Sequence, residues 1–136
     1  MTAVHVTMRV GAESYALPVS NVLEVAECGR LTAVPGASAE TLGVRNLRGE
    51  ALPVFDLATV LGISREGAAA RLVVTEDRGR RVGLAIEEVV DVGELPPGDE
   101  ETDSPFLTGA VLTDHGLIGV IDAQAVLDRL PAEGAL

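Results

Sequence analysis

An internal repeat constrains the fold of this chain more than any other feature of the sequence. Residues 5–25 align with residues 72–92, and residues 38–61 align with residues 104–127, in the same order and at nearly the same offset. Identity is low, but residue class agrees along both blocks. The matched positions are mostly apolar, and they also include Ser38 with Ser104, Gly43 with Gly109 and Asp56 with Asp122. The alternative is chance agreement between Val-rich strands, but the matched Gly, Ser and Asp positions favour a duplication, and we interpret the pattern in that way.

Each half of the repeat predicts the same succession of elements. Two β-branched strands joined by a Gly-containing turn come first, and the second of them is expected to run on. A short helical turn, two more strands and a short helix follow. The expected strands are 4–10, 15–19, 44–47 and 52–55 in the first half, and 71–76, 82–86, 110–113 and 117–121 in the second. The expected N-caps of the helical segments are Ser38, Asp56, Ser104 and Asp122.

Strands this short, with turn signals at intervals of roughly 8–12 residues, are typical of an all-β barrel or sandwich. A unit of half this length buries only a thin core, so two such units should pack on each other and leave a cleft at their junction. We therefore expect one domain over residues 1–136, made of subdomains 5–62 and 71–130 with a linker at 63–70. The Pro-rich, acidic stretch 93–105 is expected to be an exposed, mobile loop.

Charge and composition argue against several classes of function. The net charge of −11 repels phosphate backbones, so nucleic acid is not an expected partner. No run approaches the roughly 20 apolar residues of a membrane span, and a signal-peptide pattern is missing, which favours a cytoplasmic protein without direct membrane insertion. Aromatic residues are too few for a platform that stacks bases or sugars. The single cysteine, Cys28, cannot form an internal disulfide and is interpreted as a buried or idle thiol.

Signals for catalysis or metal binding are weak along the whole chain. Glu87 and Glu88 are adjacent in an expected strand, so they point to opposite faces and cannot share a proton. His5 and His115 would need converging carboxylates to hold a metal ion, and no ligand spacing is visible. The serines lack a nucleophile-elbow context, and no Gly-rich phosphate loop precedes a helix. We therefore expect neither an enzyme nor a bound cofactor or metal, and instead a rigid β scaffold that acts through its surfaces.

The hairpin turn within "GVRNLRGEALPVFDL" is the main candidate for recognition. Asn46, Arg48 and Gly49 have no matching residue types at the aligned positions of the second half. Two interpretations remain open. The segment is either only a well-made hairpin turn, which accounts for Gly49 and in part for Asn46, or a recognition surface presented by Arg48. A guanidinium at this turn can reach a carboxylate, and Glu24 is the candidate partner.

Four segments share their order and spacing with a known family. They are "YALPVSNVLEV", "GVRNLRGEALPVFDLATVLG", "RRVGLAIEEVVDV" and "GLIGVIDAQAVL". In these segments the chain resembles the chemotaxis coupling protein CheW family, over roughly residues 4–130. The most specific element is Asn-Leu-Arg-Gly, followed by an apolar-Pro-apolar strand and Asp-Leu. No receiver or kinase domain accompanies these segments, so the chain resembles the free-standing adaptor.

The resemblance implies an all-β fold of two tandem five-stranded, SH3-like barrels with short helices. It also implies an adaptor of bacterial chemotaxis, a two-component system. Such adaptors link the cytoplasmic tips of methyl-accepting chemoreceptors to the regulatory domain of the histidine kinase CheA, at membrane-associated arrays. The receptor tip is implied to dock near the groove between the barrels. By motif, the implied receptor-binding residues are Val22, Glu24, Gly43, Arg48 and Gly49, with Val89, the duplicate of Val22, on the other side of the groove. Apolar residues near the end of the first barrel are the kinase-binding candidates: Leu23, Leu31 and Leu47.

Three other interpretations of the sequence remain open. The chain could be an adaptor of a non-flagellar chemosensory array that serves surface motility or another output. It could be an enzyme built on small barrels, or a purely structural oligomer. Partner identity separates the first from a flagellar adaptor, and a screen for metal content together with the pocket chemistry tests the enzyme. Mixing with a receptor signalling fragment and a kinase separates the structural oligomer from an adaptor.

Overall fold

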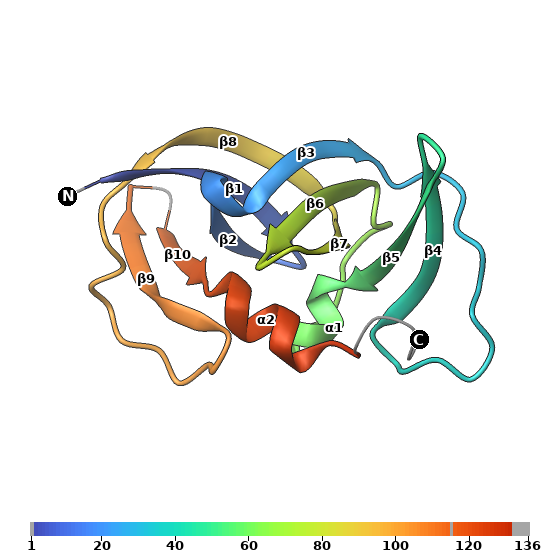
Figure 1. Cartoon of the computed structure of the whole chain (residues 1–136). Coiled ribbons are helices and arrows are strands. Elements are labelled where there is room, and N and C mark those ends of the chain that lie inside the picture. The colour runs from blue at the N-terminus through green and yellow to red at the C-terminus, as the bar shows by residue number, and fades with distance from the viewer. Residues whose placement is uncertain (1, 115, 132–136) are drawn as a thin grey trace.

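Within residues 2–114 and 116–131, which are the residues described, the computed structural model contains ten strands, two short α-helices and one 3₁₀ turn (Figure 1). The first half contains β1 (Ala3–Val10), β2 (Glu13–Pro18), η1 (Val19–Asn21), β3 (Val22–Glu27), β4 (Thr41–Leu47), β5 (Glu50–Asp56) and α1 (Leu57–Leu61). The second half contains β6 (Arg71–Asp77), β7 (Arg80–Ile86), β8 (Glu88–Leu95), β9 (Leu107–Thr113), β10 (Gly116–Ile121) and α2 (Ala123–Arg129). Apart from η1, the two halves contain the same elements in the same order.

The strands form two five-stranded sheets, and each sheet takes strands from both halves of the chain. Barrel I has the strand order β8-β1-β2-β10-β9, and barrel II has the order β3-β6-β7-β5-β4. Neighbouring strands are antiparallel except for one parallel pair in each barrel, β2 with β10 and β5 with β7. The predicted all-β class, with two small five-stranded units and short helices, is confirmed.

The membership of the sheets differs from the sequential division into 5–62 and 71–130. β1 and β2 join β8, β9 and β10, whereas β6 and β7 join β3, β4 and β5. The chain crosses between barrels after Pro18, where η1 interrupts the strand that was expected to run on, and again at Glu87. Proline lacks the amide hydrogen that a continuing sheet ladder needs. Residues 63–70 therefore connect α1 to β6, within barrel II, and do not separate two barrels.

Residue pairing agrees with the duplication at single positions. In barrel II, Val54 lies opposite Gly83 on the parallel strand. In barrel I, the equivalent Val120 lies opposite Ala16, which is the equivalent of Gly83. The two barrels are therefore two copies of one five-strand plan, and each copy combines two strands of one half with three strands of the other.

Each barrel closes through one isolated bridge and one glycine. A bridge joins the segment after β3 to β4, and another joins the segment after β8 to β9. A Cβ atom on Gly43 would lie 2.4 Å from the carbonyl oxygen of Thr32, and a Cβ atom on Gly109 would lie 2.2 Å from that of Gly98. Both distances exclude any larger residue, so the two matched glycines share a folding role.

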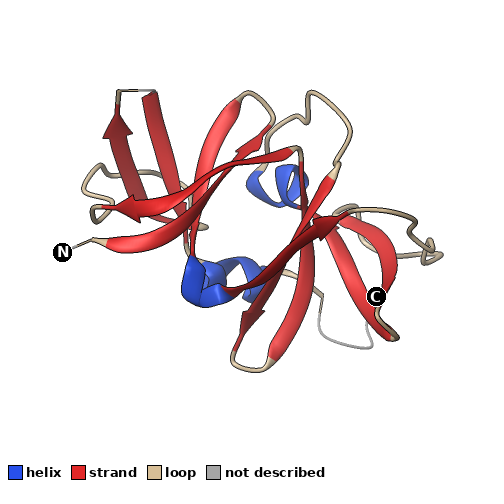
Figure 2. Ribbon diagram, turned by 90° about the horizontal axis from the view of Figure 1, so that it is seen from above, coloured by secondary structure: helices blue, strands red, loops and turns tan. Residues whose placement is uncertain are grey.

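The largest hydrophobic core lies between the barrels and against the two helices. It combines side chains of β1, β2 and β10 from barrel I with side chains of β5, β6 and β7 from barrel II. Its fully buried members include Met8, Leu17, Phe55, Leu57, Leu84, Ile86, Ile121 and Leu127. Figure 2 shows the helices between the two groups of strands. Each such side chain contributes about 1.5–3 kcal/mol by burial, so this shared core fixes the barrels to each other.

A second hydrophobic cluster lies inside barrel II alone. Its buried members are Cys28, Leu52, Val54, Leu72, Val74 and Ala85, and its partly buried neighbours are Leu31, Leu42, Leu47 and Ala69. Every strand of barrel II except β3 contributes directly, and Cys28 follows the end of β3. This cluster fills the barrel from its closing segment to the β4–β5 hairpin.

The predicted capping residues are only partly used as caps. Asp122 accepts a hydrogen bond from a backbone amide of α2 at 3.2 Å, as an N-cap should. The side chain of Asp56 instead accepts from the hydroxyl of Thr59 at 2.9 Å. The helical segments expected after Ser38 and Ser104 are single turns, because each of these segments continues into a strand within three residues.

Candidate binding site

The turn between β4 and β5 holds Arg48 at an unusual backbone conformation. Leu47 and Glu50 pair at the ends of the strands, which leaves Arg48 and Gly49 as a two-residue turn. Their φ angles are 51° and 86°, which is the type I′ geometry that matches the twist of a hairpin. The Oδ1 atom of Asn46 accepts a hydrogen bond from the Gly49 amide at 3.0 Å. Asn46 and Gly49 thus build the turn, whereas a left-handed arginine costs about 1–2 kcal/mol, so turn geometry does not explain Arg48.

Arg48 forms the ion pair that the sequence predicts with Glu24. The Arg48 Nη2 atom donates to the Glu24 Oε1 atom at 2.5 Å. Glu24 lies on β3 and Arg48 follows β4, and these are the two edge strands of barrel II. The Arg48 side chain is 71% exposed and that of Glu24 is 29% exposed. An exposed pair of this kind contributes about 0–1 kcal/mol to stability, so it is better suited to recognition than to holding the fold.

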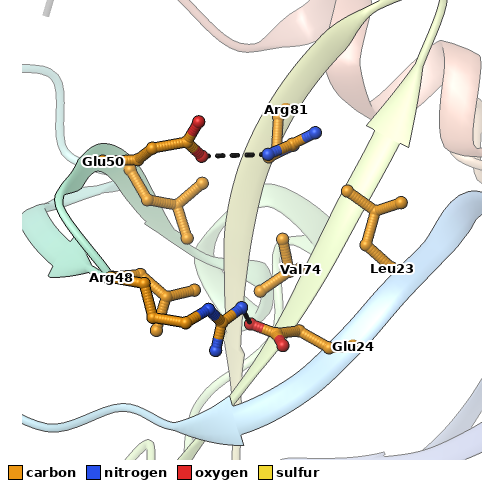
Figure 3. Close-up of a pocket in the computed structure, with 8 residues that line it drawn as sticks. Leu23, Glu24, Arg48, Glu50, Val74 and Arg81 are labelled. Atoms are coloured by element: carbon orange, nitrogen blue, oxygen red, sulfur yellow. Dashed lines mark hydrogen bonds and ion pairs between the residues drawn. The ribbon is translucent and has the colours of Figure 1, made fainter.

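A surface depression of about 350 Å³ lies beside this pair (Figure 3). Its apolar part is formed by Leu23, Leu47, Leu52 and Val74, and its charged rim by Glu24, Arg48, Glu50 and Arg81. On the side of the depression away from Arg48, Arg81 Nη1 donates to Glu50 Oε2 at 3.0 Å. Arg81 also contacts Glu76 at 3.2 Å. The depression therefore offers an apolar floor between two ion pairs, and it lies directly over the second hydrophobic cluster.

Four of the predicted site residues come together in this depression. Glu24 and Arg48 were predicted for the receptor, whereas Leu23 and Leu47 were predicted for the kinase. Gly49 belongs to the same turn. The structure thus places members of both predicted sets on one surface, and this surface belongs to barrel II alone and not to a groove between the barrels.

The other predicted residues lie elsewhere. Val22 and Val89 are partly buried against the shared core, on β3 and β8. Leu31 is partly buried against the second cluster. Gly43 is buried in β4, where it admits the backbone of Thr32. These side chains are therefore less available to a partner than the four in the depression.

Sequence reasoning missed four residues of the depression: Glu50, Leu52, Val74 and Arg81. Successive side chains of a strand point to opposite faces, so Glu50 and Leu52 share one face of β5, on the same hairpin as Leu47. This periodicity is the signal that could have indicated both residues. Val74 and Arg81 lie on β6 and β7, which the sequential division assigns to the other subdomain. Their place beside Arg48 follows from the exchange of strands between the halves, which no local pattern indicates.

Exposed apolar side chains also occur in matched positions on β3 and β8. Leu23 and its equivalent Val90 are 49% and 50% exposed. Val25 and its equivalent Val92 are 42% and 58% exposed. The repeat thus gives each barrel an outward apolar strip on the strand that follows the crossing.

The charge of the molecule is concentrated in one part of the chain. Residues 82–128 contain eleven acidic residues and neither Lys nor Arg, so they account for the whole net charge of −11. This stretch forms β8, β9 and β10 of barrel I, most of α2 and the larger part of β7. The ten arginines lie outside it, with six of them on the strands and hairpin turns of barrel II (Arg45, Arg48, Arg71, Arg78, Arg80 and Arg81). The two barrels therefore present different electrostatic surfaces.

The titratable side chains of the described residues show no constellation typical of catalysis. Cys28 is buried in the second cluster, and burial raises the pKa of its thiol. Among residues 2–114 and 116–131, no three His, Cys, Asp or Glu side chains are placed to hold a metal ion. His5 is buried in β1, and His115 lies outside the described residues. In the same described part of the chain, none of the helices is long and apolar enough to cross a membrane.

Comparison with known proteins identifies the family. A family model described as a CheW-like domain matches residues 5–130. The chain is similar to the probable chemotaxis protein CheW of Rhizobium etli, with 29% identity over 140 residues, covering 96% of this chain and 90% of the relative. It is also similar to the protein FrzA of Myxococcus xanthus, with 36% identity over 118 residues, covering 85% of this chain and 72% of the relative.

A solved structure supports the same assignment. The crystal structure of the scaffolding protein TtCheW from Thermoanaerobacter tengcongensis matches with a TM-score of 0.83 and 26% identity, over 98% of this chain and 91% of that chain. Sequence and structure thus agree over nearly the whole length. The chain belongs to the CheW-like domain family, and it is a non-enzymatic scaffold of chemosensory signalling.

Proposed function

We propose that this chain couples the cytoplasmic tips of chemoreceptors to the histidine kinase CheA. In this role it is a cytoplasmic protein recruited to membrane-associated receptor arrays. The observation that carries the proposal is the depression with an apolar floor and two flanking ion pairs, on a body that one shared core makes rigid. Such a surface can dock a helical hairpin without reacting with it.

The proposed contact divides its work between apolar and charged side chains. The floor between Glu24 and Arg48, with Leu52 and Val74 at its base, would receive apolar side chains that lie one turn apart on a receptor helix, whereas Leu23 and Leu47 remain the kinase candidates. Arg48 and Glu24 would fix the register of that helix and disfavour wrong partners, because charge complementarity adds more to specificity than to affinity. Modest contacts of this kind suffice in an array, since linked copies bind with avidity.

Val22, Val89 and Gly43 would act through the backbone that carries the contact. The two valines are held against the shared core, so they fix β3 and β8 in place. Gly43 lets the closing segment of barrel II approach β4. Gly49 and Asn46 hold the turn from which Arg48 projects.

The proposed receptor contact and the proposed kinase contact adjoin each other. Leu23 and Leu47 share the depression with Glu24 and Arg48, and Leu31 supports the same barrel from within. We expect Leu47→Ser to weaken binding of the kinase regulatory domain more than binding of the receptor fragment. Arg48→Asp should show the opposite preference. Titrations of each variant against each isolated partner measure this difference.

The proposal is tested by Arg48→Asp in a reconstituted mixture of adaptor, receptor signalling fragment and kinase. The expected result is a folded protein that no longer couples receptor to kinase activity. Arg78→Asp is the matched control, because Arg78 precedes Gly79 in an equivalent type I′ turn, with φ angles of 50° and 80°, and also forms exposed ion pairs. The control should couple normally. Equal loss in both variants, or normal coupling by Arg48→Asp, would reject the proposed surface.

A second candidate is an adaptor for a chemosensory array with a non-flagellar output. The similarity to FrzA supports it, because that relative is 36% identical over most of this chain. The same fold and depression would serve either system. Binding assays against receptor fragments and kinases from each chemosensory cluster of the source organism separate the two candidates.

A further inference from the structure

The two copies of the barrel plan differ most at the end where each barrel is closed by its isolated bridge. In barrel II this end is filled by apolar side chains of the second cluster, including Leu31, Leu42, Val54, Leu72 and Ala85. In barrel I the corresponding end is a hollow of about 460 Å³, which we call the mouth. All five strands of barrel I or the segments that adjoin them contribute to its lining: Thr2, Ala3, His5, Pro18, Leu95, Pro96, Pro97, Gly98, Thr108 and Val120.

Two substitutions between the halves make the mouth more polar than the corresponding end of barrel II. His5 is the equivalent of Leu72 in the repeat. The strand pairing agrees with this, because His5 lies opposite Gly93 in barrel I and Leu72 lies opposite Ala26, the equivalent of Gly93, in barrel II. On the strand that follows the closing segment, Thr108 stands where barrel II has Leu42. Two large apolar side chains of barrel II are thus replaced by an imidazole and a short hydroxyl side chain.

His5 gives the mouth one directional polar group. The side chain is 7% exposed, and its Nδ1 atom lies 2.8 Å from the carbonyl oxygen of Ala3. A carbonyl oxygen only accepts hydrogen bonds, so Nδ1 carries a proton, and in the tautomer with that single proton Nε2 is the acceptor atom of the imidazole. The hydroxyl groups of Thr2 and Thr108 also line the mouth, and that of Thr108 donates to the carbonyl of Val120 at 3.4 Å, so among the described lining residues His5 adds the ring nitrogen.

The remaining lining selects against charged ligands. Most of it is proline, leucine, valine and alanine, and none of the described lining residues is an arginine, lysine or carboxylate. The volume lies within the roughly 300–1,000 Å³ of small-molecule sites, which are mainly apolar with a few placed polar groups. The acidic stretch 82–128 contributes much of the surrounding barrel, so an anion would also meet an unfavourable field.

We propose that the mouth of barrel I binds a small, uncharged, mainly apolar ring compound that donates one hydrogen bond to Nε2 of His5. This site is separate from the depression of barrel II, because the two share no lining residue. A scaffold with such a site can respond to a small molecule as well as to its protein partners.

The test is an NMR titration of the isotope-labelled full chain with indole, which is apolar and has a single N–H donor. Saturable shifts are expected at His5, Leu95 and Val120, with none at the equivalent Leu72 and Val54. 1-Methylindole lacks the donor and should bind roughly two- to tenfold more weakly. An absence of saturable shifts, or equal shifts at both barrel ends, would overturn the proposed site, and equal affinity of the two compounds would overturn the role of His5.

Two variants and one control locate the binding. Thr108→Leu adds apolar volume to the mouth and should abolish the indole shifts, whereas His5→Leu removes the acceptor at similar volume and should weaken indole binding roughly two- to tenfold. Leu117→Ser changes an exposed residue of β10 outside the mouth and should leave indole binding unchanged. If either His5→Leu or Thr108→Leu retains normal indole binding, the compound lies elsewhere and the proposal fails.

A partner's side chain is the competing occupant of the mouth. In the reconstituted mixture, His5→Leu should couple receptor to kinase as the unmodified chain does. Loss of coupling by the folded His5→Leu variant, together with no indole binding by the unmodified chain, would assign the mouth to a protein partner and overturn the small-molecule site.

Discussion

Barrels I and II have the same strand order, yet they are filled and charged differently. Both contain one parallel strand pair, one closing bridge and one glycine that admits the closing segment. Barrel II has its own hydrophobic cluster and most of the arginines, whereas barrel I has a hollow mouth and most of the excess negative charge. The shared features are those that the fold requires. The differences mark positions that the fold leaves free, and both the depression and the mouth lie at such positions.

The strongest test of the shared features replaces the closing glycines. Gly43→Ala and Gly109→Ala should each lower the free energy of unfolding by about 2–4 kcal/mol, because each new Cβ atom would overlap a backbone carbonyl. Gly43→Ala should be the more damaging, since Gly43 also has a φ of 145°. Chemical denaturation measures both changes. A loss below about 1 kcal/mol in either variant would show that its closing segment is not held as described.

Exchanging the equivalent residues Leu72 and His5 tests the difference in filling. Leu72→His should destabilise the protein by about 3 kcal/mol, because it puts a polar ring into a packed apolar cluster. His5→Leu should change the free energy of unfolding by less than about 1 kcal/mol, because the mouth has room for the side chain. Thermal and denaturant unfolding of both variants provide the measurement. Equal costs for the two changes would contradict the contrast between the barrel ends.

A charge exchange separates recognition from support at the depression. In the double variant Glu24→Arg with Arg48→Glu, an ion pair can form again, so the free energy of unfolding should change by less than about 1 kcal/mol. Coupling of receptor to kinase should still be lost, because the positions of the two charges are reversed. The reconstituted kinase assay reports coupling. Full recovery in the double variant, compared with Arg48→Asp alone, would make the pair structural.

The smallest expected effect on the free energy of unfolding comes from the titration of Tyr15. Its equivalent in barrel II is Val82, which does not titrate. Burial raises the pKa of Tyr15 above its ordinary value of 10.0, and a hydrogen bond to Glu13 and the charge of Glu13 raise it further. Above pH 10 the unfolded chain loses this proton while the folded chain keeps it. The contribution to stability is therefore complete below pH 10 and decreases as the pH rises beyond it.

The absorbance of tyrosinate follows this titration directly, because Tyr15 is the single tyrosine of the chain. In Glu13→Gln the midpoint should move down toward the ordinary value. A midpoint near pH 10 in the unmodified, folded protein would contradict the buried, hydrogen-bonded environment of Tyr15.

Local patterns in the sequence were sufficient for the elements and for one interaction of the site. The repeat predicted the common order of strands, and "NLRG" predicted a tight turn that presents Arg48 to Glu24. Both features depend on residues close in sequence or matched by the repeat. Gly, Asn and alternating apolar residues report such features through backbone geometry.

The partition of the strands could not be predicted in the same way. Each half contains a complete set of five strands, so closing a barrel within one half or across both halves satisfies the same hydrophobic pattern. Pro18 permits the crossing at η1 but does not say where the next strand pairs. For this reason the sequence placed Val74 and Arg81 in another subdomain, although both border the depression that contains Arg48.

The crossing strands make the molecule a single mechanical body. A cut within residues 63–70 would leave one fragment with β1–β5 and another with β6–β10, and neither fragment would own a complete barrel. Tension applied to one barrel is carried by covalent chain into the other at Pro18 and at Glu87, and the shared core packs the two barrels against each other. A scaffold held between two partners in an array can thus pass on a displacement from one to the other as a stiff spacer.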